Sequence, residues 1–456
     1  MALKWTAKSN GALANSANVQ PKLSLQRLGQ AIGLCSVVGA AALLSPTAHA
    51  LKTDFGMEYR ATAFASGSDA FETLGGSDSD TGFGQLIRVK GNFLDEETGI
   101  SVYTSVELAG DRWTGDDRKY GTTNDQSFNS TSRGDNVRLD LGYLQIPVGH
   151  TVFRVGRQAT SYNNCFLVCD DRRDRIIMIQ PFSKTLSVVL GYDRRQDSTP
   201  FEHQDNGDMM NLGVITKLGD WDLGLLYVKW MNNYEGTVGV APTPYVLQNV
   251  DLFSGYLSGD LLGLAKATVG FNYFMNGNVE NPVDNVYFTD KSPSAYLRLT
   301  QSFGVIDAGL QYVTSKDGGL ISPGFDTYSS LINSNPEATA SATSMYRMGG
   351  TLGREDFDEN LIIGKATWNL TPKFAITGAV GNLDIDNGTD SDDSMVYDLQ
   401  LSYQANKALR TWLSVGMIEK NDAGALTGND LVGSLAGADF SDDDVKAASL
   451  NMSVNF

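Results

Sequence analysis

The sequence predicts an all-β fold: a transmembrane antiparallel β-barrel of about 18 strands, with 16 as the alternative. Three observations predict it. Apolar and polar residues alternate with a period of two, short and long connections alternate along the chain, and proline stays out of the interiors of the expected strands. Because successive side chains of a strand point to opposite faces, each such segment has one apolar face and one polar face.

The alternation is clearest in four segments. Its apolar positions are Phe55, Met57, Tyr59, Ala61 and Ala63; Phe83, Ile87, Val89 and Phe93; Val137, Leu139, Leu141 and Tyr143; and Met395, Tyr397, Leu399, Leu401 and Tyr403. Polar or charged residues fill the positions between them, among them Arg88, Lys90 and Asp140. We expect the apolar sets to face lipid and the polar sets to face the barrel interior.

The connections between the expected strands alternate in length. Short turns fall near residues 95–99, 147–150, 182–185, 218–220, 259–263, 303–304, 371–373 and 405–408. Long polar segments fall near 66–81, 112–136, 158–175, 194–208, 232–248, 276–292, 315–358, 382–393 and 420–445. Short turns at one rim and long loops at the other are typical of bacterial outer-membrane barrels. The alternative, a secreted soluble propeller or solenoid, does not need this regularity.

The first 50 residues have the features of a secretory signal. Their charged residues are all basic: Lys4, Lys8, Lys22 and Arg27. An uncharged, largely apolar stretch then runs from 31 to 44, which is shorter than the roughly 20 residues of a membrane-spanning helix. A small-x-small pattern ends at Ala50, so we expect cleavage after Ala50 and a barrel formed by residues 51–456.

The charge balance excludes one class of partner. The whole chain has a net charge of −18, and all the charges of residues 1–50 are positive, so the rest of the chain is more acidic still. Duplex nucleic acid needs clustered Lys and Arg, so no nucleic-acid partner is expected. Acidic residues gather near 69–80, 384–393 and 422–444 without completing a calcium-loop motif. We therefore expect solvated surface loops, no metal site and no cofactor.

A barrel of 16 to 18 strands leaves an aqueous channel, whereas about eight strands enclose only side chains. Charged residues on the expected inner face would line that channel. The candidates on the wall are Glu58, Arg60, Arg88, Lys90, Glu107, Arg138, Asp140, Arg154 and Arg157. A lumen lined by charge passes small polar solutes and sorts ions by the local field. The alternative is that some of these residues lie at the rim, against solvent or lipid head groups.

The segment 158–175 combines apolar and charged residues in an unusual way. It contains Cys165 and Cys169, which in an oxidising compartment favour a small disulfide over a metal site. Six charged residues then follow in a row: Asp170, Asp171, Arg172, Arg173, Asp174 and Arg175. We expect this third long loop to fold into the barrel and narrow the pore. The alternative is an external loop with a solvated charge run.

The C-terminal strand alternates Leu450, Met452, Val454 and Phe456 with Ser and Asn residues. It resembles the terminal strand, ending in Phe, that the outer-membrane assembly machinery recognises. Phe456 is therefore the expected assembly signal. Three further segments, 139–145, 155–158 and 170–176, resemble a narrower group of outer-membrane proteins.

With these features the chain resembles a Gram-negative outer-membrane porin, and within that class it looks most like the homotrimeric porins of sulfate-reducing bacteria. The resemblance implies a homotrimer in the cell outer membrane, in contact with lipid and lipopolysaccharide. It also implies an eyelet loop, 158–175, opposite a basic wall of Arg60, Arg88, Arg138 and Arg154. General porins usually have sixteen strands and a mainly acidic eyelet loop, and this chain departs from both patterns.

The resulting functional hypothesis is a passive diffusion channel for small hydrophilic solutes and ions, with a possible preference for small anions. A substrate-selective channel for sugars or organic acids is the nearest alternative. A barrel hydrolase would need a base, for which the mature chain offers His150, expected in a short turn, and His203, expected in a long loop. An adhesin or envelope anchor is the remaining class, and it predicts no conductance. We expect a channel and not an enzyme.

Overall fold

The computed structural model describes residues 51–72, 77–112, 137–196, 207–232, 249–275, 291–333, 344–349, 354–429, 433–435, 438, 440–441 and 443–456. The expected signal with its cleavage site after Ala50 lies outside the described residues, and so does His203. In the part of the chain that the structure describes, no helix is long and apolar enough to cross a membrane.

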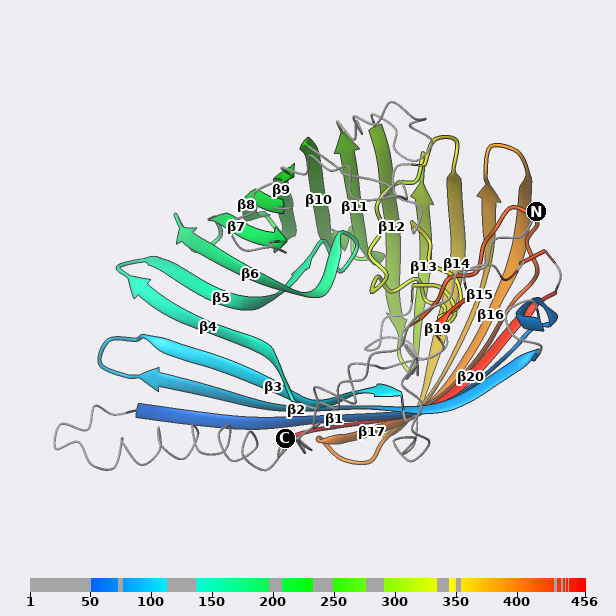
Figure 1. Ribbon diagram of the computed structural model, residues 1–456, viewed down its shortest axis with the longest axis horizontal. Coiled ribbons are helices and arrows are strands. Elements are labelled where there is room, and N and C mark those ends of the chain that lie inside the picture. The colour runs from blue at the N-terminus through cyan, green and yellow to red at the C-terminus, as the bar shows by residue number, and fades with distance from the viewer. Residues whose placement is uncertain are drawn as a thin grey trace, which may run out of the picture. The chain divides into compact units, whose positions relative to one another are not determined.

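The described residues form one 18-stranded antiparallel sheet (Figure 1). Its first half consists of β1 (Leu51–Gly67), β2 (Ser79–Asp95), β3 (Ser101–Arg112), β4 (Arg138–Val148), β5 (Thr151–Tyr162), β6 (Val168–Pro181), β7 (Ser187–Gln196), β8 (Gly207–Leu218) and β9 (Trp221–Asn232). Its second half consists of β10 (Asn249–Leu261), β11 (Ala265–Met275), β12 (Lys291–Phe303), β13 (Ile306–Ser315), β14 (Asp358–Thr371), β15 (Phe374–Asp386), β16 (Ser391–Gln404), β17 (Leu409–Ile418) and β20 (Val445–Asn455). A short 3-10 helix, η1 (Asp69–Phe71), follows β1, and the two-residue strands β18 (Gly428–Asn429) and β19 (Gly433–Ser434) pair with each other.

The sheet closes on itself because its first and last strands pair. β1 and β20 run antiparallel from Glu58↔Asn455 to Gly67↔Lys446, and the backbone N–H of Phe456 donates to the carbonyl of Met57 at 3.0 Å. In a bilayer each unpaired backbone polar group costs several kcal/mol, so a sheet that spans it must have no free edge. The predicted barrel and its 18 strands are confirmed.

The predicted short turns all fall between paired strands, within a few residues of their expected positions. Not all of the predicted long connections are confirmed. Between β15 and β16 the connection is only 387–390, so the long loop expected near 382–393 is wrong. Asp384 and Asp393 face each other in the strand ladder there, and the backbone N–H groups of the turn are bound by Asn387 and Asp386 side chains.

The segment 158–175, which was expected as a long loop between strands, is a β-hairpin. β5 pairs with β4 as far as Arg157, and β6 pairs with β7 from Asp174 onward. Beyond those points β5 and β6 pair with each other, up to Tyr162↔Val168. This self-pairing satisfies the backbone groups where the wall strands no longer do. We call residues 158–173 the inner hairpin; Figure 1 shows it leaving the wall between β4 and β7 and reaching toward β12.

A β-bulge at Asp140 overturns part of the expected alternation. Ser105 pairs with Leu141 and Val106 pairs with Leu139, so Asp140 is an extra residue in β4. Past a bulge the two faces of a strand are exchanged. Leu139 is therefore exposed on the outer face, as expected. Tyr143 instead lies on the inner face and stacks on Tyr103, with the two ring centroids 5.3 Å apart.

A second element also lies inside the barrel. We call the connection between β13 and β14 (residues 316–357) the inner loop; its described parts are 316–333, 344–349 and 354–357. Its fully buried apolar side chains include Ile321, Phe325, Leu331, Ile332, Met345 and Met348. They belong to one large apolar cluster with inward side chains of β12 to β17, such as Leu361 and Val396. The expectation of a polar outer loop is wrong here, because this segment carries enough apolar area to pack against the wall.

The inner loop is held by hydrogen bonds to the inner face of the wall. The carbonyl of Leu320 accepts from Asn272 Nδ2 at 2.8 Å and from Ser294 Oγ at 2.6 Å. Two wall carboxylates accept backbone N–H groups of the loop: Asp398 from Ser330 at 2.9 Å, and Glu359 from Gly349 at 2.8 Å. The loop is therefore fixed to the barrel at several points around its lumen.

Gly156 marks the place where β5 turns away from the wall. Its φ is +124°, a backbone conformation that side chains rarely adopt, and a Cβ there would collide with the carbonyl oxygen of Gly142. We expect Gly156→Ala to lower the free energy of unfolding by about 1–3 kcal/mol. Urea denaturation in detergent, followed by tryptophan fluorescence, measures this.

Gly213→Ala is the matched control, because a Cβ at that position would make ordinary contacts of 3.6 Å or more and its φ is not positive. We expect this control to be neutral or slightly stabilising. Equal stabilities of the two variants would contradict the assignment of Gly156 as the bend.

Candidate functional site

Seven of the charged wall residues predicted from the sequence lie in one ion-pair network on the inner faces of β1 to β4. Glu58 binds Arg60 and Lys90, each at 2.7 Å. Arg88 Nε lies 3.2 Å from Glu107 and 3.3 Å from Asp140. Arg138 donates to Glu107 Oε1 through Nε at 2.8 Å. The register explains the contacts, because Arg88, Glu107 and Arg138 occupy facing positions on three consecutive strands.

The carboxylates and the cations of this network differ in exposure. The side chains of Glu58, Glu107 and Asp140 are only 4–5% exposed. By contrast, Arg138 is 53% exposed, Lys90 is 36% exposed and Arg60 is 29% exposed. The acids therefore lie beneath the bases, and the surface that this part of the wall presents is basic. Carboxylates in this position also orient the cations, since each buried charge needs a partner.

Asp140 joins the inner hairpin to the wall. Its Oδ1 accepts from Nε of Arg172, in the hairpin, at 2.7 Å, and its Oδ2 accepts from Ser105 Oγ at 2.8 Å. The bulge places this carboxylate at the point where the chain of β4 no longer pairs with β5. With Arg172 and its second partner Asp170, the network has five cations against four carboxylates.

Three further charged residues of β6 form a second cluster around Asp193 of β7. Arg175 donates to Asp193 at 2.8 and 2.9 Å, and Arg173 Nη1 lies 3.4 Å from the same carboxylate. Asp171 binds Arg173 Nε at 2.7 Å. Asp193 is fully buried, and its role was missed from the sequence. The sequence did contain a signal for this role: Asp193 is a single carboxylate at an inward position of a strand next to an Arg-rich segment.

Three of the remaining candidates, Arg154, Arg157 and Asp174, lie apart from both clusters. Arg154 donates to Gln145 Oε1 at 2.8 Å and lies over the ring of Tyr143. Arg157 and Asp174 face each other in the β5–β6 ladder, 3.5 Å apart. They share their face with Val155 and Ile176, which are exposed on the outer side. Asp170 belongs to the wall network, because Arg172 Nη1 binds it at 2.6 Å.

The tip of the inner hairpin is anchored on the opposite wall. Asn163 Nδ2 lies 3.1 Å from each of three acceptors on β10 and β11: Ser254 Oγ and the carbonyls of Gly255 and Phe271. Asn164 Nδ2 donates to the hydroxyl of Tyr296 on β12 at 2.8 Å. Ser254 and Tyr296 are buried on the inner face, so the hairpin crosses the interior of the barrel.

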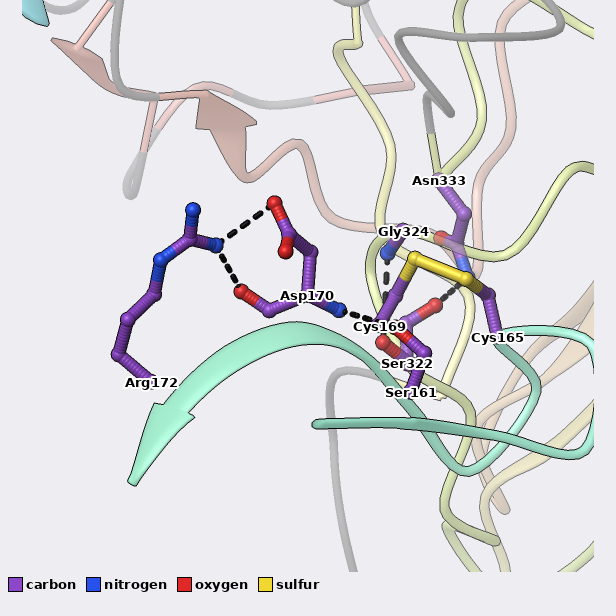
Figure 2. The surroundings of a disulfide bond; sticks show 8 residues. All are labelled: Ser161, Cys165, Cys169, Asp170, Arg172, Ser322, Gly324 and Asn333. Atoms are coloured by element: carbon purple, nitrogen blue, oxygen red, sulfur yellow. Dashed lines mark hydrogen bonds and ion pairs between the residues drawn. A yellow bond between two sulfur atoms is a disulfide. The ribbon is translucent and has the colours of Figure 1, made fainter. Parts of the chain in front are cut away.

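The tip also contacts the inner loop. Phe166 packs against Phe325 with ring centroids 4.9 Å apart, and its carbonyl accepts from the backbone N–H of Ser322 at 2.9 Å. Cys165 and Cys169 form a disulfide at the tip, and Figure 2 shows Ser322 and Gly324 of the inner loop beside it. A Cβ on Gly324 would lie 2.6 Å from Cys169 Cβ, so only glycine permits this approach. The hairpin and the loop thus meet inside the lumen.

Aromatic and cationic groups line the same side of the inner loop. Lys365 Nζ lies 3.8 Å from the ring centroid of Tyr328, and Arg298 donates to the carbonyl of Asp326 at 2.7 Å. Burial raises the pKa of Tyr328 to about 12, so this side chain stays neutral at physiological pH. Within the described ranges, no group of three or more His, Cys, Asp or Glu side chains could hold a metal ion.

Comparison with known proteins agrees with this architecture. The sequence matches no family model and no curated protein. Among solved structures, OccK3 (OpdO) of Pseudomonas aeruginosa is similar with a TM-score of 0.55 and 11% identity, over 89% of this chain and 96% of that chain. OccK1 (OpdK) of the same organism gives 0.54 and 10%, over 89% and 98%. The outer membrane protein OprD of that organism gives 0.53 and 11%, over 89% and 93%. At these identities the similarity shows the fold: an 18-stranded barrel of the outer-membrane type.

The anchoring of the tip leads to a testable difference between two neighbouring asparagines. Both have left-handed backbones, with φ of 55° at Asn163 and 52° at Asn164, so the backbone cost of alanine is the same. Asn163→Ala removes the contacts to three acceptors and should weaken the anchor by about 1–3 kcal/mol. We expect larger current noise and a higher mean conductance in single-channel recordings. Asn164→Ala, the control, removes only the single hydrogen bond to Tyr296 and should change both quantities less. Identical noise in all three proteins would contradict the anchoring role.

Proposed function

We propose that this protein is an outer-membrane channel that lets small hydrophilic solutes and ions diffuse passively, with a preference for small anions. Support comes first from the barrel itself, since 18 strands enclose more space than wall side chains can fill. The observation that carries the anion preference is the arrangement of the wall network. Its three carboxylates on the wall strands are buried beneath cations, so a solute beside β1 to β4 meets mainly Lys and Arg.

The path that we propose for solutes is bounded by three elements. The basic wall of β1 to β4 forms one side, the inner hairpin forms the second, and the inner loop forms the third. The hairpin is joined to the wall through Asp140 and to the loop through Phe166. The segment 158–175, which contains the inner hairpin, is thus the proposed constriction, with Arg172 next to the wall.

A substrate-selective channel for organic acids or sugars is the second candidate. The observation that favours it is the inner loop, which narrows the lumen in addition to the hairpin and brings aromatic rings next to cations at Lys365 and Arg298. An anionic solute with an apolar body would suit such surroundings. Flux assays with organic acids and with sugars of similar size separate the two candidates.

Four further proposals rest on the sequence. Residues 1–50 direct export and are removed after Ala50. The terminal strand ending at Phe456, whose side chain is exposed, is recognised by the assembly machinery. The mature barrel forms a homotrimer, and its outer surface contacts membrane lipid and lipopolysaccharide.

The reversal potential in a KCl gradient across a planar bilayer tests the anion preference. We expect the sign of an anion-selective channel. Arg138→Gln removes the most exposed cation of the network and should lower the anion-to-cation permeability ratio by roughly twofold, as a local potential change of order kT would.

Lys184→Gln is the control, because it removes the same charge from an exposed turn between β6 and β7. We expect it to leave the ratio unchanged. A cation-selective sign for wild type would contradict the proposed preference. Folded protein without ion conductance would contradict the channel itself and favour an adhesin or anchor.

A further inference from the structure

The outer surface of the barrel has a recess of about 830 Å³ across β14 to β17. Its floor includes Gly364, Ala366 and Gly378, whose small side chains leave the strand backbones uncovered. Val380 and Leu399 stand beside this floor and are 51% and 45% exposed. Because these two side chains are on the outer face, the recess opens toward the surroundings of the barrel.

The lumen side of the same strands is covered. On β17, a Cβ at Gly416 would collide with Leu331 of the inner loop, and on β13 a Cβ at Gly309 would lie 3.0 Å from the Tyr328 hydroxyl. Neither Leu331 nor Tyr328 lines the recess. The recess is therefore a feature of the membrane-facing surface and is separate from the proposed solute path.

One cation of the outer face lies at an end of the recess. Lys365 and Asp398 also line it, but their side chains contact Tyr328 and Ser330 on the lumen side. Lys446 is exposed and begins a row of facing outer positions that continues through Met417, Tyr397 and Val380 to Gly364. Lys446 is the second residue of β20 and Gly364 is the seventh of β14. Both strands begin at the rim of the long connections, so Gly364 lies five residues deeper along its strand, about 17 Å at the usual rise per residue. The row thus descends from the rim toward the middle of the membrane.

We propose that this recess binds an acyl chain of lipid A, the phosphorylated lipid of the outer leaflet, with a phosphate group at Lys446; this inference rests on the proposed contact of the outer surface with lipopolysaccharide. The charge at the rim and the apolar lining below it match the two parts of such a lipid in their order along the membrane normal. A hydrocarbon chain fits a surface where Gly364, Ala366 and Gly378 leave room for it, since dispersion contacts are lost across an empty gap. The phosphate is attracted to Lys446 at the water boundary.

The full chain, purified in detergent, is titrated with lipid A, and the bound lipid is counted by native mass spectrometry. Gly378→Leu fills the recess, where a Cβ meets no atom within 4 Å, and should weaken binding by about tenfold. Lys446→Gln should weaken binding by a smaller factor, and for phosphorylated lipid A but not for its dephosphorylated form. Ala295→Leu is the control: it adds a leucine to the outer face of β12, opposite the exposed Phe271 and outside the recess.

Heat-modifiable electrophoretic mobility first verifies that each variant is folded, and Ala366→Leu replaces Gly378→Leu if the latter is not. Equal affinities of the recess variant and Ala295→Leu would overturn the proposal. A changed oligomeric state of the recess variant with an unchanged lipid count would also overturn it, because a second copy of the chain would then occupy the recess.

Discussion

The backbone pairing of β1 with β20 is the interaction on which the other features depend. It removes the only edges that a sheet of this length would otherwise expose to lipid, where free N–H and C=O groups are too costly to leave unpaired. Once the wall is closed, its inner face becomes a separate environment with its own solvent. Charged side chains that lipid would reject can then lie on alternate positions of every strand.

Inside the barrel the chain has two elements that an open pore does not require, the inner hairpin and the inner loop. The inner hairpin leaves the wall at Gly156, contacts Asp140 on one side and is anchored near Asn163 on the other. The inner loop packs its apolar side chains on β12 to β17. Neither element covers the cations on the wall of β1 to β4 completely, and the buried carboxylates there hold those cations in place.

Much of the barrel could be predicted from the sequence. Lipid on the outside and water on the inside require apolar and polar residues to alternate along each strand, and this alternation is visible in the sequence of a single strand. The inward charges at Glu58, Arg88 and Glu107 followed directly from that alternation. The pattern failed where one inserted residue, Asp140, exchanged the faces of β4, since a bulge leaves no signature in composition.

The inner loop could not be predicted because its partners are remote. Ser330 binds Asp398 and Gly349 binds Glu359, and nothing local in the sequence relates these pairs. Its apolar residues, such as Phe325 and Leu331, were the one available signal. The inner hairpin was predicted to enter the barrel from its charge and cysteine pattern, but its regular pairing was not, since runs of Asp and Arg have low strand propensity.

The most direct test of the account places a single reporter on the basic wall. Arg138→Cys is treated, in an open channel in a planar bilayer, with a negatively charged thiol reagent, and the attached mass is verified afterwards. If this wall lines the conducting path, modification lowers the current and shifts the reversal potential toward cation preference. Complete modification with an unchanged current and reversal potential would contradict the account, because solutes would then pass elsewhere or not at all.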